Sequence, residues 1–424
     1  MRFRLTTAVL VTALIAAPLT SHASTRAPRA GCSWPMLLDE DALNAAFPDT
    51  SATYWMAHFP YAAGGELTIR GRYPDVRYFS FHVYDEAQRP VDSIADYEIR
   101  PDVGGNPFVT KTTHPGRYTV HVEFAPRPRH PASNTIYAGA MQSGTPNPGG
   151  FLIYRIYIPT DPKEPTGGVP LPTITLRSPA GDASLALGRC DPVPPKAPGH
   201  AVNKHVRESN YQKVGPQFFP VPGAHDPPRF ERFFGTDQAA WDSAPDNPVT
   251  PDKPFFKGGF LSNEQVAYLF TRTSRQFGDI LVVHAKAPSF PDTRRGVSVV
   301  SHRDVRYWSV CQNEGATQRV VACSPDYQTA IRNGHFTIVI SDPKDRPTNA
   351  DRAHGITWLP WGGAYYDGVV IYRYMLPAAT FDEAIQRIRP HDDPADVMGA
   401  YMPIAGYCAK SRFQHRGWRA CVSK

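Results

Sequence analysis

Long apolar runs and strong charge of one sign are both missing from most of this chain. After residue 23, no stretch approaches the roughly 20 consecutive apolar residues that a transmembrane helix needs. We therefore expect no transmembrane segment once those first residues are removed. The formal net charge of the 424 residues is +6, and the Lys and Arg residues form no block. So mild and dispersed a charge predicts no nucleic-acid partner.

Standard catalytic signatures are missing as well. The sequence contains no Gly-x-Ser-x-Gly elbow, no His-Glu-x-x-His zinc helix, no P-loop and no dinucleotide-binding glycine fingerprint. Ser341 and Lys344 match Ser-x-x-Lys, but residues 160–163 repeat the Asp-Pro-Lys spelling after another predicted strand. A repeated Asp-Pro turn explains both segments better than a nucleophile does. The sequence predicts no cofactor and leaves open whether the protein is an enzyme.

The first 23 residues have the pattern of a secretory signal peptide. A basic start is followed by the mostly apolar segment Leu5–Thr20 and by small residues at Ser21 and Ala23. The mature chain is therefore expected to begin at Ser24. We predict an exported protein, either periplasmic or extracellular.

Cysteine is scarce, but its number is even. Six cysteines in an exported chain predict three disulfides. Zinc is the alternative, but the sequence has no Cys-x-x-Cys pair. Two pairs of cysteines are close in sequence, and a bridge between the remaining two would join the ends of the first domain. The predicted bridges are Cys311–Cys323, Cys408–Cys421 and Cys32–Cys190.

Three sequence blocks occur twice, in the same order. Thr119 and Tyr154 return as Thr337 and Tyr372, at the same spacing. Each block is rich in Val, Ile, Tyr and Phe, which is typical of strands. A chain organised in this way is predicted to be duplicated. The paired blocks are Asp75–Ser80 with Asp304–Ser309, Arg117–Val122 with His335–Ile340, and Ile153–Pro159 with Ile371–Pro377.

The predicted fold class is mainly β, with two tandem, internally duplicated β-sandwich or jelly-roll-like domains and few short helices. The 44 prolines and many aromatic residues favour short strands joined by rigid turns. The expected domains are residues 24–190 and 229–424, the second ending in a disulfide-closed tail. Residues 191–228 carry nine prolines and are expected to be a stiff linker. Helices are expected at Leu37–Phe47 and Phe381–Arg389.

Titratable side chains are plentiful but scattered along the chain. Three of the strand histidines could form a metal site if their strands converged, although surface or half-buried strand residues are the simpler interpretation, and we predict no metal. Adjacent carboxylates on a strand point to opposite faces, so neither acidic pair predicts glycoside hydrolysis. The histidines are His82, His121, His284 and His335, and the acidic pairs are Asp85-Glu86 and Asp392-Asp393.

Arg155 and Arg373 stand inside apolar strands at the same place in both repeats. A permanently charged guanidinium there needs a carboxylate, ordered water or an anionic ligand. Because the arginine occurs in both copies, a structural ion pair is favoured over a ligand site. Asp75 or Asp304 could be the partner in such an ion pair.

Aromatic residues are densest between Trp358 and Gly368. Exposed rings on this Pro- and Gly-containing loop would form a platform for a sugar or an apolar ligand. Alternatively, the rings cover the open end of the second sandwich. The predicted binding residues are Trp308, Trp358, Trp361, Tyr365, Tyr366 and Arg373.

The segment Thr357–Pro360, followed by the strand Val370–Pro377, resembles the terminal signature of bacterial exported proteins with domains of unknown function 1254 and 1214. In that family an Asn-Trp-Leu-Pro segment precedes a strand with a central Arg and a closing Pro. Here Thr357 replaces the Asn. The resemblance implies a jelly-roll-like β-domain and brings no reaction with it.

These patterns together favour an exported protein that binds a small molecule or glycan in an aromatic-lined cleft. An exported enzyme acting on carbohydrate or on a small carbonyl substrate is one alternative. A structural or adhesive envelope protein is another. An enzyme should show titratable side chains converging in a deep pocket, and a binding module should show an aromatic groove.

Overall fold

The computed structural model describes residues 32–178, 184–190, 226–235, 258–315, 317–363 and 366–422. The expected signal peptide, the cleavage site before Ser24 and nearly all of the expected linker lie outside these ranges. The described residues are mainly β, as predicted. Residues 32–190 form two antiparallel-dominated sheets of five strands each. The strands are β1 Met36–Leu38, β2 Ala52–Pro60, β3 Glu66–Arg72, β4 Val76–Asp85, β5 Pro90–Ala95, β6 Arg117–Glu123, β7 Thr135–Tyr137, β8 Gly149–Pro159, β9 Thr173–Arg177 and β10 Ser184–Ala186.

The second half, from residue 226 onward, also forms two sheets. Its strands are β11 Glu231–Phe233, β12 Val266–Ser274, β13 Ile280–Lys286, β14 Val305–Glu314, β15 Arg319–Pro325, β16 Ile331–Arg332, β17 His335–Ser341, β18 Thr357–Pro360, β19 Asp367–Pro377 and β20 Ile404–Cys408. The described helices are short: α3 Pro394–Met398 and α4 Lys410–Arg416, with 3-10 turns η1 Arg275–Phe277, η2 Thr293–Arg295, η3 Pro343–Asp345, η4 Arg352–His354, η5 Ile385–Arg387, η6 Gly399–Tyr401 and η7 Trp418–Ala420.

The repeated blocks occupy equivalent positions in the two halves. One sheet of the first half has the order β1-β2-β8-β4-β5, and its counterpart has the order β11-β12-β19-β14-β15. In the other sheets, β3 lies between β6 and β9 as β13 lies between β17 and β20. Even the parallel pairing of β6 with β7 recurs, between β17 and β18.

Each half has its own core between its two sheets. Alternation along β6 illustrates the cause, because Tyr118, Val120 and Val122 are buried while the intervening residues face outward. Aromatic residues fill much of both cores. Phe79, Phe81 and Tyr154 are packed in the first, and Trp308, Phe336 and Tyr372 in the second. Each half is therefore a β-sandwich.

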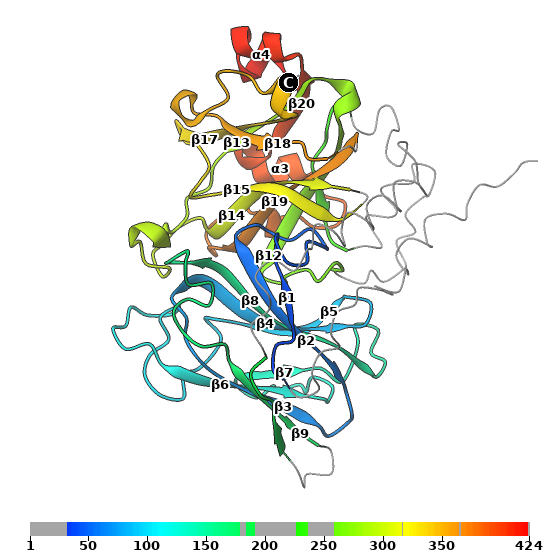
Figure 1. Ribbon diagram of the computed structural model, residues 1–424, viewed down its shortest axis with the longest axis vertical. Coiled ribbons are helices and arrows are strands. Elements are labelled where there is room, and N and C mark those ends of the chain that lie inside the picture. Colours follow the sequence, from blue (N-terminus) through cyan, green and yellow to red (C-terminus); the bar gives the residue numbers. More distant parts are fainter. Residues whose placement is uncertain are drawn as a thin grey trace, which may run out of the picture.

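A third apolar cluster joins the two sandwiches. It contains Tyr78 and Tyr157 from the first half and Tyr307 and Met375 from the second. All four residues come from two sheets, the one that contains β8 and the one that contains β19. These two sheets lie next to each other in Figure 1. The halves thus pack through their equivalent sheets, leaving β3, β6 and β9 at one end and β13, β17 and β20 at the other.

Two ion pairs cross this interface reciprocally. Arg77 of the first half binds Asp326 of the second, with an Nη1–Oδ1 distance of 2.6 Å. Arg306, the equivalent of Arg77, binds Asp96, the equivalent of Asp326, at 2.5 Å. Each aspartate also accepts a backbone N–H from its own half, from Phe79 or from Trp308. The two pairs are related as in a two-fold symmetric interface.

The three predicted disulfides form in the structure. Cys311–Cys323 joins adjacent strands β14 and β15, and Cys408–Cys421 closes the C-terminal tail. Cys32–Cys190 joins the two ends of the first half across 158 residues. Disulfides of this kind fit an exported protein.

Both expected helices are wrong. Met36–Leu38 is strand β1, and the following loop has left-handed backbone at Ala46 and Phe47, with φ of 61° and 54°. Contacts with the second half hold this loop, including the bond from Phe47 N to the carbonyl of Gln318. Within Phe381–Arg389 only the single 3-10 turn at Ile385–Arg387 forms. No helix within the described ranges is long and apolar enough to cross a bilayer.

Candidate functional site

A pocket of about 390 Å³ opens at one end of the second sandwich. The segments that follow β12 and β17 contribute to its wall, together with residues of β13, β17 and β20. Leu281, Ile340 and Trp361 are buried and contribute apolar surface. Polar and aromatic side chains supply the rest. The lining residues are Arg275, Gly278, Asp279, Leu281, Ile340, Ser341, Asp342, Lys344, Asp345, Trp361, Tyr366 and Tyr407.

Arg275 organises the polar side of this pocket. Its Nη1 lies 2.7 Å from Asp342 Oδ1, and its Nη2 donates to the carbonyl of Gly363 at 3.1 Å. The guanidinium also lies 5.6 Å from the ring centroid of Tyr366. The Tyr407 hydroxyl accepts the backbone N–H of Ser274 at 2.9 Å, and burial raises the pKa of this phenol. The pocket thus presents a fixed ion pair beside two phenol rings, those of Tyr366 and Tyr407.

Ser341 and Lys344 both line the pocket, but their geometry supports the turn interpretation. The Ser341 hydroxyl accepts from Trp358 Nε1 at 3.0 Å and donates to the Asp342 carbonyl at 2.9 Å. The Lys344 carbonyl accepts from Lys410 Nζ at 2.9 Å. These contacts hold the turn at η3 against the C-terminal helix α4. The hydrogen bonds of the Ser341 hydroxyl therefore hold this part of the pocket wall in place.

The structure does not bring the predicted binding residues together as one platform. Trp308 is 0% exposed and packs in the core, so the prediction that it extends a stacking surface is wrong. Trp361 is 3% exposed, packs in the same core and also contributes to the lining of the pocket. Trp358 is partly buried beneath Arg346, whose guanidinium lies 4.7 Å from its ring centroid. Tyr366 is 43% exposed at the pocket mouth. Tyr365 lies outside the described residues.

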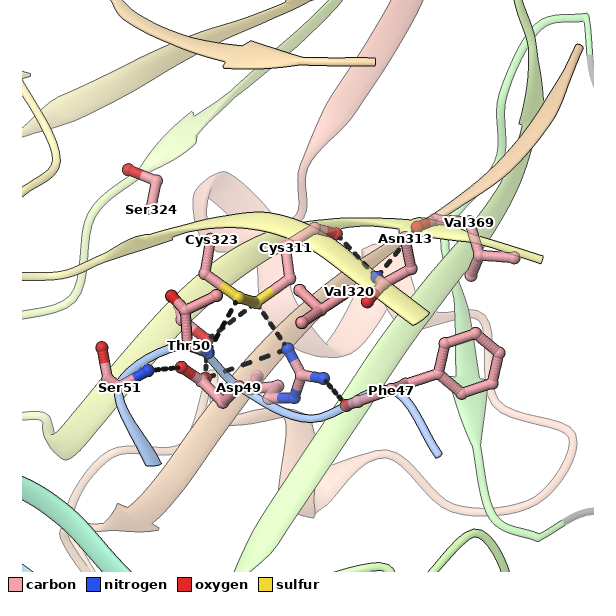
Figure 2. Close-up of a disulfide and its surroundings, with 12 residues drawn as sticks. Phe47, Asp49, Thr50, Ser51, Cys311, Asn313, Val320, Cys323, Ser324 and Val369 are labelled. Atoms are coloured by element: carbon pink, nitrogen blue, oxygen red, sulfur yellow. Dashed lines mark hydrogen bonds and ion pairs between the residues drawn. A yellow bond between two sulfur atoms is a disulfide. The ribbon is translucent and has the colours of Figure 1, made fainter. Parts of the chain in front are cut away.

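Arg373 faces the other half of the molecule, away from the pocket. It is 3% exposed, and its Nη2 donates to the carbonyl of Phe47 at 2.7 Å. Its Nη1 lies 2.7 Å from Cys311 Sγ and 3.9 Å from Asp49 Oδ2. Figure 2 shows the loop with Phe47 and Asp49 lying against the Cys311–Cys323 disulfide. Asp49 also accepts from the hydroxyls of Tyr307 and Ser309.

Arg155 occupies the equivalent position and receives the equivalent loop from the second half. Its Nη2 donates to the carbonyl of Leu261 at 2.8 Å and to the Tyr84 hydroxyl at 3.0 Å. Asp75 and Asp304 are therefore the wrong partners for these arginines. Asp75 instead accepts from the Thr160 hydroxyl, and Asp304 accepts from the backbone N–H of Ser289.

The pocket residues Arg275, Asp342 and Tyr407 were not anticipated from the sequence. They come from three strand ends that are far apart in the chain, and no short motif links them. Asp49 was also missed, although a carboxylate partner for Arg373 was expected. The sequence predicts a helix over Leu37–Phe47, whereas left-handed backbone at Ala46 and Phe47 leads the chain to Asp49 beside Arg373.

Cysteine and carboxylate groups meet at one place in the described part of the chain. Asp49, Cys311 and Cys323 offer potential metal-ligand atoms within 4.8 Å of one another. The two sulfurs are bonded to each other, so neither is the thiolate that binds metal ions. In this oxidised state the cluster has a structural role.

The strand histidines lie in three separate environments. His82 is buried between the halves, where its Nδ1 lies 3.1 Å from the Ser80 hydroxyl. His121 pairs with Glu66 on the outer sheet of the first half. His284 and His335 stack on the outer sheet of the second half, with ring centroids 5.3 Å apart. These four residues do not converge on a shared metal site.

The pKa of His284 offers a test of the outer-sheet geometry. Burial, followed by the nearby His335 and Arg419, lowers this pKa from 6.5 to about 4. The imidazole is also stacked on Trp418 at a centroid distance of 3.6 Å. We expect its NMR titration midpoint near 4. Its contribution to stability should be complete above pH 6.5 and should be lost as the pH falls toward 4.

Replacing Trp418 by alanine should move the His284 midpoint upward, because it removes the ring that buries the imidazole. A midpoint near 6.5 in the parent protein, unchanged in Trp418→Ala, would contradict this packing.

Comparisons with known proteins identify no family for this chain. No family model matches the chain, and no curated protein matches it, so the resemblance to the family with domains 1254 and 1214 stays a prediction. Among solved structures, the chain is similar to an uncharacterised protein from Burkholderia cenocepacia, with 13% identity and a TM-score of 0.47, over 82% of this chain and 78% of that one. It is also similar to the VPA0106 protein from Vibrio parahaemolyticus, with 14% identity and a TM-score of 0.38, over 86% of this chain and 92% of that one.

Proposed function

We propose that this is an exported binding protein whose pocket in the second sandwich holds a saccharide-sized polar ligand. The observation that carries the proposal is the pocket itself, in which Tyr366 and Tyr407 lie beside the Arg275–Asp342 ion pair. Aromatic faces stack on the apolar faces of sugar rings, while charged groups bind hydroxyls in fixed directions. A volume of about 390 Å³ is in the range of small-molecule sites.

Further observations support export of the protein and duplication of its sandwich domain. Three disulfides are stable where the surroundings are oxidising, and the first residues have the pattern of a signal peptide. The matching strand orders and the reciprocal ion pairs support descent of both halves from one sandwich domain. All residues that line the pocket belong to the second half, and Tyr407 comes from its C-terminal segment.

Replacing Tyr366 by alanine is the most direct test of the pocket. The parent protein is first screened by calorimetry against neutral hexoses, hexosamines and uronic acids. Loss of one stacking ring should then weaken binding by about 1–2 kcal/mol, or roughly 5- to 30-fold. Because Tyr366 is 43% exposed, the substitution should leave the midpoint of unfolding nearly unchanged.

Tyr97→Ala is the matched control for this substitution. Tyr97 is 40% exposed and lies 5.7 Å from the guanidinium of Arg306, much as Tyr366 lies near Arg275. It belongs to the first half and does not line the pocket. If Tyr97→Ala and Tyr366→Ala weakened binding equally, or if no saccharide bound the parent protein, the pocket would not be a sugar site.

A further inference from the structure

The two buried arginines at the interface have equivalent surroundings that differ in charge. In the register of the sheets, Arg155 lies opposite Tyr54 and Ser80, and Arg373 lies opposite Tyr268 and Ser309. Each guanidinium donates to the carbonyl of a left-handed residue in a loop of the other half. These residues are Leu261 and Phe47, each with φ of 54°.

Two residues further along each loop, the two sites differ in the charge of the side chain. Asp49 stands in the loop that reaches Arg373, and its carboxylate accepts from the Tyr307 hydroxyl at 2.9 Å. Asn263 stands in the loop that reaches Arg155, and its amide oxygen accepts from the Tyr78 hydroxyl at 3.2 Å. The Arg373 site therefore contains an anion supplied by the chain. The Arg155 site has a neutral amide in its place.

The described partners of the Arg155 guanidinium are all uncharged: the Leu261 carbonyl, the Tyr84 hydroxyl and the Tyr54 ring, whose centroid lies 5.0 Å from Cζ. The Arg155 side chain is 2% exposed, and it forms no ion pair with a described carboxylate. Its Nε and Nη1, and Nδ2 of Asn263, are buried without a hydrogen-bond partner in the described chain. All three are donors. An isolated buried cation destabilises the folded state unless an anion offsets its charge.

Nearby titratable groups do not supply that anion. Burial raises the pKa of Tyr54 and Tyr84, so both phenols stay neutral at pH 7. Burial and the charge of Arg155 lower the pKa of His82, which is therefore a neutral imidazole. Glu264 follows Asn263 but is exposed to solvent. The buried groups around Arg155 are thus neutral, and the site has a net positive charge.

We propose that the Arg155 site binds a small monovalent anion between the two halves, in the role that Asp49 plays at the Arg373 site. A halide or a small carboxylate such as formate carries one negative charge and accepts hydrogen bonds from donors such as those left unpartnered on Arg155 and Asn263. The anion would act as a structural ligand of the interface. This inference is independent of the pocket in the second sandwich.

The test uses the full exported chain with its disulfides intact. The protein is unfolded in urea, freed of small anions, and refolded in sodium gluconate, whose anion is large. Chloride or formate is then titrated in at constant ionic strength. The thermal midpoint should rise saturably, by about 2–4 °C or more, because the ligand binds only the folded state.

Two matched substitutions locate the effect. Asn263→Asp places a carboxylate beside Arg155 as at the equivalent site, and should raise the midpoint in gluconate and abolish the response to chloride. Asp49→Asn removes the carboxylate beside Arg373 and should add a second anion response. Crystals refolded and grown in bromide should show an anomalous peak next to Arg155.

Three results would overturn the proposal. The first is a midpoint of the parent protein that is the same in gluconate, formate and chloride, without a bromide peak. The second is a response to chloride that persists in Asn263→Asp, since the anion would then bind elsewhere. The third is a lower midpoint for Asn263→Asp than for the parent protein in gluconate.

Discussion

Replacing Arg77 by alanine is expected to lower the free energy of unfolding by about 3–5 kcal/mol, because it leaves a buried carboxylate without its partner. The side chains of Arg77 and Asp326 are both 0% exposed, and two contacts of 2.6 and 2.8 Å join them. Arg77 Nε also donates to the Thr293 hydroxyl. Urea unfolding followed by tryptophan fluorescence would measure the loss.

The control is a double substitution, Arg77→Met with Asp326→Leu. Removing both charges and keeping the volume should recover most of the lost stability, because no buried charge is left unpaired. Arg306→Ala should cost less than Arg77→Ala, since its side chain is 12% exposed and water can partly solvate the vacated Asp96. A loss below about 1 kcal/mol for Arg77→Ala would show that the pair behaves like an exposed one.

Sequence repeats predicted much of the architecture. The repeated blocks that contain Arg77 and Arg306 form β4 and β14. Those that contain Arg155 and Arg373 form β8 and β19. These predictions succeeded because β-strand composition and turn residues are local signals. The disulfides also followed from spacing and number. Local patterns were sufficient wherever both partners belonged to one half.

The interactions between the halves could not be predicted in the same way. Burial of Arg155 and Arg373 was expected, but their true neighbours come from loops in the opposite half. The repeat does contain Arg77 with Asp96 and Arg306 with Asp326, yet each arginine binds the aspartate of the other copy. Only the packing of the two sandwiches reveals this exchange.

The helical spacing of apolar residues gave a wrong prediction in one segment, where these residues are buried without forming a helix. In Phe381–Arg389, the buried residues Phe381, Ala384, Ile385 and Ile388 have helical spacing. They form turns that cover the core of the second half, while the Gln386 side chain donates to the carbonyl of Tyr374. Tertiary contacts outweighed the weak helical preference of a short segment. Tertiary contacts also determine the position of Trp361, which lies in a loop but packs its ring into the core of the second half.

The second large effect is expected from the disulfide between Cys32 and Cys190. Replacing both cysteines by serine should lower the free energy of unfolding by about 5 kcal/mol, because a loop of 158 residues would no longer be closed in the unfolded chain. The bridge also holds the segment that carries Trp34, which is 3% exposed in the first core. Trp34 Nε1 donates to the carbonyl of Pro172 at 2.7 Å.

Cys408→Ser with Cys421→Ser is the matched control, because that bridge spans only 13 residues. Loop closure there should contribute about 3 kcal/mol, so the two double variants should differ by about 2 kcal/mol. Urea unfolding of both variants against the parent protein measures the difference, and peptide mapping without reductant checks that the remaining cysteines stay paired. Equal losses would mean that native contacts such as those of Trp34, and not closure of the chain, determine what each disulfide contributes. A smaller loss for the Cys32–Cys190 variant would contradict the chain-entropy account for this protein.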